Sequence, residues 1–286
     1  MINIFIVEQD TLFSKKTLTL GGDVIDLTTP ICMGILNITP DSFYEKSRKS
    51  GDAIIAQAGQ YLEEGASILD VGGYSSRPGA EHISLEEELQ RVIPAVRNII
   101  SHFPGTHISI DTFRAEVASA AIEEGADMVN DITGGEGDPD MFNLVASKNV
   151  GYVLMHMRGT PQTMKNLTDY SNLLEEITEY FRSRISVLDK LNVNKIVIDP
   201  GIGFAKTADQ SFEIIKNLRI FDILKKPVLV GVSRKSLIQK ILGNTSGDAL
   251  NGTTVLNTVA LLNGASILRV HDVKYAMEAI KLVKEL

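Results

Sequence analysis

The most constraining feature of this sequence is a regular alternation between short apolar runs and longer segments of helical periodicity. Runs this continuously apolar are typical of strands buried on both faces, as in a parallel sheet covered by helices. There are eight of them: ICMGILN (31–37), SILDVGG (67–73), HISIDT (107–112), DMVNDIT (127–133), GYVLMHM (151–157), KIVIDPG (195–201), KPVLVGVS (226–233) and ASILRVHD (265–272). Eight such units in 286 residues predict an α/β fold, a single (β/α)8 TIM barrel. An open doubly wound sheet is the alternative, but the glycine-rich nucleotide turn is missing after the first run.

Residues 1–30 follow a different pattern from the rest of the chain. Their apolar and polar residues alternate around turn residues, which predicts a β-hairpin extension ahead of the barrel. We expect this extension to close the bottom of the barrel. No linker or low-complexity stretch follows it, so we expect one domain over residues 1–286.

Charge and composition narrow the possible partners. A net charge of −8 argues against non-specific nucleic-acid binding, which needs basic surface. No stretch approaches the roughly 18 apolar residues of a membrane span, and the first residues do not resemble a secretory signal. The one cysteine, Cys32, cannot form an internal disulfide. We therefore expect a cytoplasmic protein that binds neither membranes nor nucleic acid.

Polar residues stand at the carboxyl end of every predicted strand. In a TIM barrel, catalytic residues lie at these ends. One polar residue there is more often a helix cap, but eight in equivalent places predict a small-molecule site. In strand order the candidates are Asn37; Asp70 and Arg77; Asp111; Asn130 and Asp131; His156; Asp199; Arg234 and Lys235; Arg269 and His271.

The carboxyl ends of the strands together form the rim of the barrel. The candidates on this rim divide into two halves by their hydrogen-bonding character. Asp111, Asn130 and Asp199 supply acceptors and one amide, which suit a flat heterocycle with amino and lactam edges, such as a purine or a pterin. The second half supplies donors for a phosphate-like group, and the loops after strands seven and eight are the usual phosphate site of this fold. The donors are Arg77, Lys235, Arg269 and His271.

Several motifs together resemble one family, the dihydropteroate synthases. They include MGILNITPDSF (33–43), SSRPGA (75–80), IDPGIGFAK (198–206) and VGVSRKS (230–236), and they occur in the family's order. A lone DPGIGF would be a weak signal, whereas NITPDSF and SRKS together are specific. The resemblance implies a transferase of folate biosynthesis that joins dihydropterin-CH2-pyrophosphate to para-aminobenzoate, giving dihydropteroate and pyrophosphate. It further implies a TIM barrel, a Mg2+ cofactor, a homodimer and a target for sulfonamides.

The resemblance also assigns residues to ligands. Pterin contacts are implied for Asp111, Asn130, Asp199 and Lys235, and anion contacts for Asn37, Arg77, Arg269 and His271. Asn37 would also be the metal ligand. Para-aminobenzoate would lie against Ser76, Pro78, Phe204, Lys235 and Ser236, with its carboxylate at the start of the helix that begins at Ser236. The residues expected to take part in catalysis are Glu45, Arg77, Asp111 and Lys235.

Two loops depart from the family pattern. In DSFYEKS (41–47), Glu45 replaces an aspartate and glycines are lost, whereas in GGYSSRPG (72–79), Tyr74 replaces a glutamate and Ser76 a threonine. Two other readings therefore remain open. One is the pterin-binding domain of a corrinoid methyltransferase system, which would need only the acceptor half of the rim. The other is a non-catalytic barrel that binds a pterin and serves as a scaffold.

Three further residues carry structural predictions. Arg234 is expected to turn away from the site into an ion pair, and His156 to be a hydrogen-bonded core histidine. Ser84 is expected to cap the helix that begins SLEEELQRV, with Glu87 three residues on. The acidic residues of that segment are predicted to be surface charge.

Overall fold

The structure is a computed structural model that describes residues 17–38, 49–75, 82–243 and 245–286. Four residues with expected roles in the site, Glu45, Ser76, Arg77 and Pro78, lie outside this part of the chain.

Eight parallel strands form the centre of the molecule, as the apolar runs predicted. Their order in the sheet is β8-β7-β6-β5-β4-β3-β10-β9. A bridge between Ile198 and Val228 and a 2.9 Å hydrogen bond from Ile198 N to Pro227 O join the two edges. The sheet therefore closes into the predicted TIM barrel. The strands are β3 (Ile31–Asn37), β4 (Ile68–Gly72), β5 (His107–Asp111), β6 (Met128–Asp131), β7 (Gly151–Met155), β8 (Ile196–Asp199), β9 (Leu229–Val230) and β10 (Ile267–Val270).

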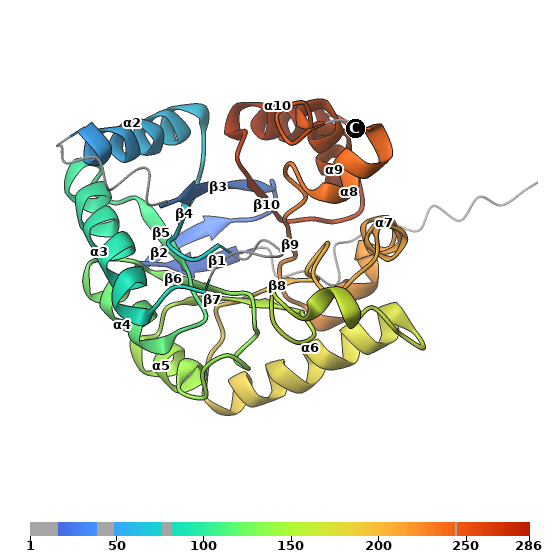
Figure 1. Cartoon of the computed structure of the whole chain (residues 1–286), viewed down its shortest axis with the longest axis horizontal. Helices are drawn as coiled ribbons and strands as arrows, with labels where there is room; N and C mark the ends of the chain where they lie inside the picture. The colour runs from blue at the N-terminus through green and yellow to red at the C-terminus, as the bar shows by residue number, and fades with distance from the viewer. Residues whose placement is uncertain (1–16, 39–48, 76–81, 244) are drawn as a thin grey trace, which may run out of the picture.

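Helices surround this barrel (Figure 1). They are α2 (Lys49–Glu64), α3 (Leu85–His102), α4 (Ala115–Glu123), α5 (Met141–Lys148), α6 (Leu173–Lys190), α7 (Ala208–Lys216), α8 (Ser236–Leu242), α9 (Leu250–Leu262) and α10 (Val273–Val283), with 3-10 turns η1 (Met164–Asn166) and η2 (Leu218–Leu224). The main core lies between strands and helices. In α3, for example, Val92, Val96 and Ile99 recur at helical spacing, and all three are buried in it.

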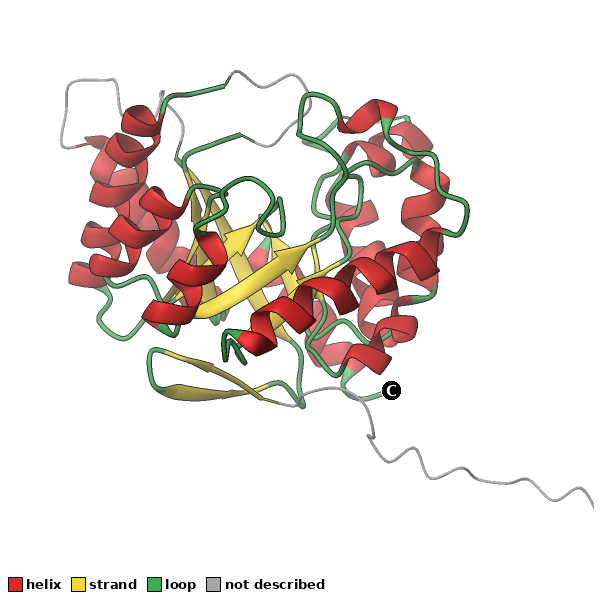
Figure 2. Cartoon of the chain, turned by 90° about the horizontal axis from the view of Figure 1, so that it is seen from below, coloured by secondary structure: helices red, strands yellow, loops and turns green. Residues whose placement is uncertain are grey.

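The expected hairpin lies across one end of the barrel (Figure 2). Strands β1 (Thr17–Leu20) and β2 (Asp23–Asp26) pair antiparallel, and Leu18 and Leu20 are buried. They pack in one cluster with side chains from the interior of the barrel, including Met33 and Val153. A Cβ atom at Gly151 would lie 2.5 Å from Leu20 Cδ2, so only glycine admits this contact. The hairpin closes the bottom of the barrel, as predicted.

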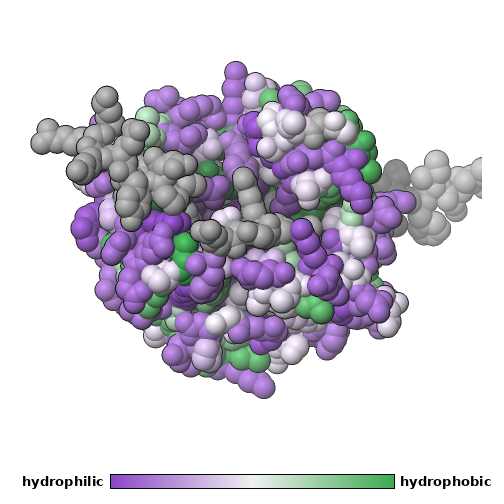
Figure 3. Space-filling model, viewed as in Figure 1, coloured by the Kyte–Doolittle hydropathy of each residue, from purple (hydrophilic) through white to green (hydrophobic). Residues whose placement is uncertain are grey.

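The carboxyl ends of the strands lie at the opposite end. Figure 3 looks onto this end, where hydrophilic residues predominate over the visible surface. Among the described residues, no helix has both the length and the apolar character that crossing a membrane requires.

Candidate active site

A buried cluster of charged groups forms the centre of the rim. Arg269 of β10 donates from Nε to Asp70 Oδ2 at 2.6 Å and from Nη2 to Asp111 Oδ2 at 2.5 Å. The amide of Asn130 donates to Asp70 Oδ2 at 3.1 Å. Glycine at position 72 leaves room for this arrangement, because a Cβ there would lie 3.2 Å from Asp111 Cβ. The adjacent strands β4, β5 and β6, together with β10 on the far side of β3, thus bring their polar residues into contact.

The environment of this cluster shifts its proton equilibria. Burial raises the pKa of Asp111 to about 7 despite the opposing charge of Arg269, and the carboxylate of Asp70 adds to the rise. Burial disfavours the charge of Arg269, but Asp70 and Asp111 hold the pKa of its guanidinium above the ordinary value. Asp70 Oδ1 is buried without a hydrogen-bond partner in the described structure. A buried acceptor left in this way is suited to a donor brought by a ligand or water.

Asp70 was a strand-end candidate in the sequence but was assigned to no ligand, and Arg269 was assigned to the anion half. The structure places both in the acceptor half, where Asp70 joins Arg269 to Asn130. The two halves of the rim are therefore in contact. The signal for Asp70 was a single carboxylate inside an otherwise apolar run, which is costly to bury unless it is paired.

Lys235 and Asp199 form the next part of the rim. The Lys235 ammonium donates to Ile202 O at 2.5 Å and lies 4.7 Å from the centre of the Phe204 ring. Burial lowers the pKa of Lys235 to about 8, whereas the charge of Asp199 acts in the opposite direction. Burial raises the pKa of Asp199, and Lys235 opposes that rise. Three residues expected to bind substrate are thus gathered around one loop.

The turn after β9 explains how two adjacent cations serve different purposes. Arg234 has a left-handed backbone with φ of 54°, and its guanidinium donates to both carboxylate oxygens of Asp272, at 2.9 and 2.7 Å. The predicted structural ion pair of Arg234 is confirmed. Lys235 turns toward the loop that holds Phe204, and Ser236 begins α8 with an exposed side chain.

His271 and Asn37 complete the described candidates. His271 Nδ1 lies 3.1 Å from Ser233 Oγ, and its backbone carbonyl accepts from Tyr61 Oη at 2.8 Å. Asn37 ends β3 with an exposed side chain. Across the described ranges, no group of three or more His, Cys, Asp or Glu side chains is placed to bind a metal.

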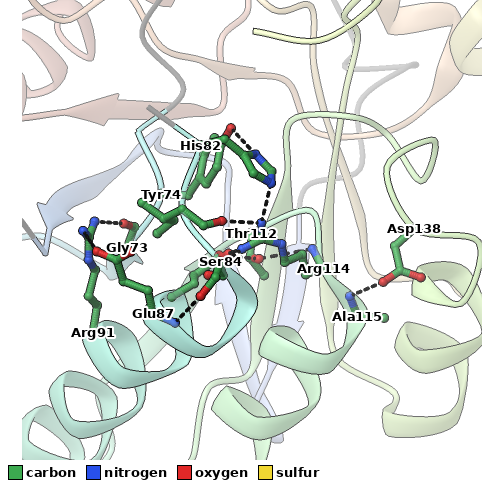
Figure 4. Close-up of polar contacts among 12 residues, drawn as sticks. Gly73, Tyr74, His82, Ser84, Glu87, Arg91, Thr112, Arg114, Ala115 and Asp138 are labelled. Atoms are coloured by element: carbon green, nitrogen blue, oxygen red, sulfur yellow. Dashed lines mark hydrogen bonds and ion pairs between the residues drawn. The ribbon is translucent and has the colours of Figure 1, made fainter. Parts of the chain in front are cut away.

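A second polar cluster lies beside the rim and accounts for Tyr74 (Figure 4). Tyr74 Oη lies 3.2 Å from His82 Nδ1 and accepts from the amide of Gln162 at 3.2 Å. On its other side, His82 Nε2 lies 3.3 Å from Arg114 Nη2. Tyr74 therefore links the loop after β4 to the segment before α3 and to the loop after β7.

In the same cluster, Arg114 forms an ion pair with the buried carboxylate of Glu88. It donates from Nη1 to Glu88 Oε2 at 2.5 Å, and Thr112 Oγ1 donates to Glu88 Oε1 at 2.7 Å. Ser84 caps α3 as predicted, accepting from Glu87 N at 3.1 Å. The expectation that the acids of this helix are surface charge is wrong for Glu88, whose exposure is 0%. Its position faces inward because it lies one turn before Val92 on the buried side of α3.

His156 is a buried, hydrogen-bonded histidine, as predicted. Its partner is Lys206, whose Nζ lies 2.9 Å from His156 Nδ1. Sequence reasoning did not single out Lys206, because a lone lysine is exposed by default and its partner is 50 residues away.

Comparison with known proteins gives one consistent result. The model of a family described as pterin binding enzymes matches residues 33–271. A dihydropteroate synthase of Synechocystis is 44% identical over 258 residues, which cover 89% of each chain. Its counterpart in Escherichia coli is 38% identical over 267 residues, covering 92% of this chain and 94% of the relative.

Solved structures agree with these relatives. The Xanthomonas albilineans dihydropteroate synthase with 4-aminobenzoic acid has a TM-score of 0.87 and 34% identity, covering 95% of this chain and 98% of the other. The same enzyme in complex with 7,8-dihydropteroate has a TM-score of 0.82 and 30% identity, with the same coverage.

Proposed function

The chain belongs to the family of pterin binding enzymes, and from this membership we propose how its rim performs the reaction of a dihydropteroate synthase. That reaction is a transfer in folate synthesis. The amine of para-aminobenzoate attacks the methylene carbon of dihydropterin-CH2-pyrophosphate. A C–N bond forms, the C–O bond breaks with its electron pair going to pyrophosphate, and the amine loses a proton.

The acceptor half of the rim holds the pterin. Asp111 and Asp199 accept from its N–H groups, and Asn130 both donates and accepts. The unpartnered Oδ1 of Asp70 offers one further acceptor. If the C–O bond breaks ahead of attack, positive charge spreads into the pterin, and these carboxylates stabilise it. Charges fixed in advance in this way commonly make the largest contribution to catalysis.

Donors stabilise the opposite charge on the leaving group. We assign this part to Asn37, Arg77, Arg269 and His271, with Arg77 outside the described residues. Arg269 is held by Asp70 and Asp111, so it also balances the carboxylates of the pterin half. We also propose that Glu45, which lies between β3 and α2 in the sequence, takes part in catalysis.

Para-aminobenzoate takes the position beside Phe204, Lys235 and Ser236, together with Ser76 and Pro78. Phe204 provides an aromatic face, and Ser236 provides a hydroxyl and a backbone N–H at the start of α8. The arylamine is mostly neutral at pH 7, so its attack needs no strong base. Lys235 contacts both substrates and links their positions.

The exposed amide of Asn37 fits a magnesium site in which phosphate oxygens of the substrate supply the other ligands. Mg2+ prefers oxygen ligands, retains several waters, and is commonly held by one or two protein groups plus phosphate oxygens. A single amide oxygen therefore suffices, without a cluster of carboxylates. When bound, the ion supplies Lewis-acid stabilisation of the pyrophosphate.

We also propose a cytoplasmic homodimer. Helices α8 and α9 leave apolar side chains exposed, and Gly252 of α9 brings the two helices together, since a Cβ there would lie 3.0 Å from Leu242 Cδ1. A second copy of this chain is the partner that we assign to these side chains, because apolar patches shared by two helices are typical of subunit interfaces. The exposed apolar side chains are Ile241, Leu242, Val255 and Leu262.

One observation carries the proposal: Asp111, Asn130, Asp199 and Lys235 meet at one rim, in a chain that matches these synthases along most of its length. The experiment is an assay of pyrophosphate release with each substrate alone and with both together. Release that requires both supports the synthase. Release without para-aminobenzoate, or none with both substrates and magnesium, contradicts it.

A further inference from the structure

Lys206 and His156 are buried titratable residues that the transfer reaction does not use. Lys206 is 7% exposed and His156 is 3% exposed. Three acceptors surround the Lys206 Nζ atom: His156 Nδ1 at 2.9 Å, His156 O at 3.2 Å and Phe204 O at 2.9 Å. The side chain therefore joins the end of β7 to the loop that follows β8.

The geometry fits one protonation state of this pair. An ammonium group has three protons and no lone pair, so three acceptors match it fully. Burial, with the charge of Lys206 as a further cause, lowers the pKa of His156 to about 2, which keeps the ring neutral. When Nδ1 accepts from a charged Lys206, the ring proton lies on Nε2.

Burial also lowers the pKa of Lys206 well below its ordinary value, although Asp199 acts in the opposite direction. A neutral amine, however, would turn a lone pair toward one of three acceptors. That loss of hydrogen bonding leads us to treat Lys206 as charged.

The loop that Lys206 contacts has a conformation that the chain would not adopt unaided. Gly201, Gly203 and Ala205 all have positive φ, at 69°, 79° and 49°. A Cβ at Gly201 would lie 2.1 Å from His156 O, and alanine rarely adopts the left-handed region. Such a backbone persists only where surrounding contacts hold it.

Two lysines supply such contacts from different elements. Lys235 donates to Ile202 O at 2.5 Å, and Lys206 donates to Phe204 O at 2.9 Å. Tyr170 Oη adds a 3.0 Å hydrogen bond to Ala205 O. The Phe204 ring, which faces Lys235 Nζ, therefore sits on a backbone whose carbonyl is fixed by Lys206.

We propose that Lys206 and His156 are positioning residues that fix the backbone of Phe204 and thereby shape the para-aminobenzoate side of the site. The inference rests on the proposed function. The pair acts through Phe204 and touches no substrate. Its loss should weaken use of para-aminobenzoate more than use of the pterin, because two of the pterin contacts, Asp111 and Asn130, lie on strands that do not carry this loop.

The first test compares Lys206→Met with Lys216→Met, a change at an exposed lysine of the adjoining helix α7. We expect Lys206→Met to raise the KM for para-aminobenzoate about tenfold or more, as the loss of a charged hydrogen bond would. The KM for the pterin substrate should change less than about threefold, and the control should match the wild type. Equal changes in both KM values, or none, would overturn the proposal.

The second test separates positioning from packing. Asn at 156 keeps an acceptor near the position of Nδ1, whereas Leu does not. We expect His156→Asn to retain the wild-type KM for para-aminobenzoate within about threefold, and His156→Leu to reproduce the effect of Lys206→Met. An equal KM for para-aminobenzoate in the two variants at position 156 would contradict the positioning role.

A third measurement needs no variant and no activity. Nitrogen-15 NMR of the wild type should show His156 as the neutral Nε2–H tautomer between about pH 5 and 8. A proton on Nδ1 would remove the acceptor and overturn the inference. If the wild type releases no pyrophosphate, the proposed function fails, but this measurement still decides whether the Lys206–His156 pair exists as described.

Discussion

The turn at residues 232–236 sends two neighbouring cations to opposite destinations. The left-handed backbone at Arg234 reverses the chain, and Thr253 Oγ1 holds it by accepting from Arg234 N at 3.0 Å. Arg234 then reaches Asp272, while Lys235 reaches Ile202 O. Adjacent residues of the same charge are therefore expected to respond very differently to truncation.

Lys235→Ala should reduce activity far more than stability. It removes the contact that we propose to both substrates, and one preorganised polar contact is worth about 3–4 kcal/mol of barrier, or roughly a hundredfold to a thousandfold in kcat. The measurement is steady-state kinetics beside thermal unfolding. Early melting with near-normal turnover would show instead that Lys235 is a packing residue.

Arg234→Ala is the matched comparison and should show the reverse pattern. Losing a paired, partly buried guanidinium should lower the free energy of unfolding by about 1.5–3 kcal/mol. At temperatures where the variant is folded, kcat should stay within a few-fold of the wild type. A loss of activity as large as that of Lys235→Ala would place Arg234 in the site.

The raised pKa of Asp111 predicts a pH dependence of pterin binding. The proposed pterin contact requires an ionised carboxylate, and with a pKa of about 7 Asp111 becomes protonated below neutrality. Affinity should therefore fall as the pH decreases through about 7, as measured by calorimetric titration. Asp111→Asn should bind weakly without this dependence, and a wild-type affinity constant down to about pH 5 would contradict the prediction.

For single residues, the sequence predicted where polar side chains lie better than it predicted which residues they contact. The strand ends, the outward turn of Arg234 and the burial of His156 followed from local patterns. The paired burial of Asp70, Glu88 and Lys206 did not, because each of these charged residues depends on a partner far along the chain: Arg269, Arg114 and His156. Periodicity reports which face of an element is apolar, but not which charge is neutralised there.

At the scale of elements, the hairpin is attached to the barrel through a histidine as well as through leucines. His107 Nδ1 lies 2.6 Å from Asp127 Oδ2, and Nε2 lies 3.8 Å from Asp23 Oδ2 in β2. The hydrogen bond to Asp127 raises the pKa of His107, against the effect of burial. Protonated His107 therefore strengthens the link between the hairpin and the barrel.

The sign of the resulting pH effect follows from linkage. A folded-state pKa above the unfolded value of 6.5 contributes stability that is fully present below 6.5 and is lost as the pH rises through the folded value. His107→Gln should lower the free energy of unfolding by about 1–2 kcal/mol at about pH 5.5 and by less at about pH 8.5, as measured by urea denaturation. An equal loss at both values would show that the charge is irrelevant.

Helix α3 offers a second element-scale prediction. Glu88→Ala leaves Arg114 without its buried partner and should cost about 3–5 kcal/mol of stability. Glu124→Ala breaks the exposed pair with Arg97, which solvent screens, and should cost far less stability. Urea denaturation of both variants measures the difference, and similar costs would mean that Glu88 is not buried as a charge.

At the scale of the whole molecule, the apolar side chains of α8 and α9 predict association. Val255→Lys should convert the proposed dimer into a monomer, because it places a charge in an apolar interface. Val187→Lys, at an exposed apolar position on α6, is the control and should remain dimeric. Sedimentation velocity distinguishes the outcomes, and a monomeric wild type would refute the assignment of this surface.

The hairpin has a further consequence for turnover. Since Leu18 and Leu20 fill the bottom of the barrel, molecules exchange with solvent at the opposite end. Two substrates must arrive and two products depart through the same opening, and the two products together occupy the space that both substrates need. The next pair of substrates can enter only after the last product has left. The residence time of that product therefore limits turnover as directly as the height of the chemical barrier.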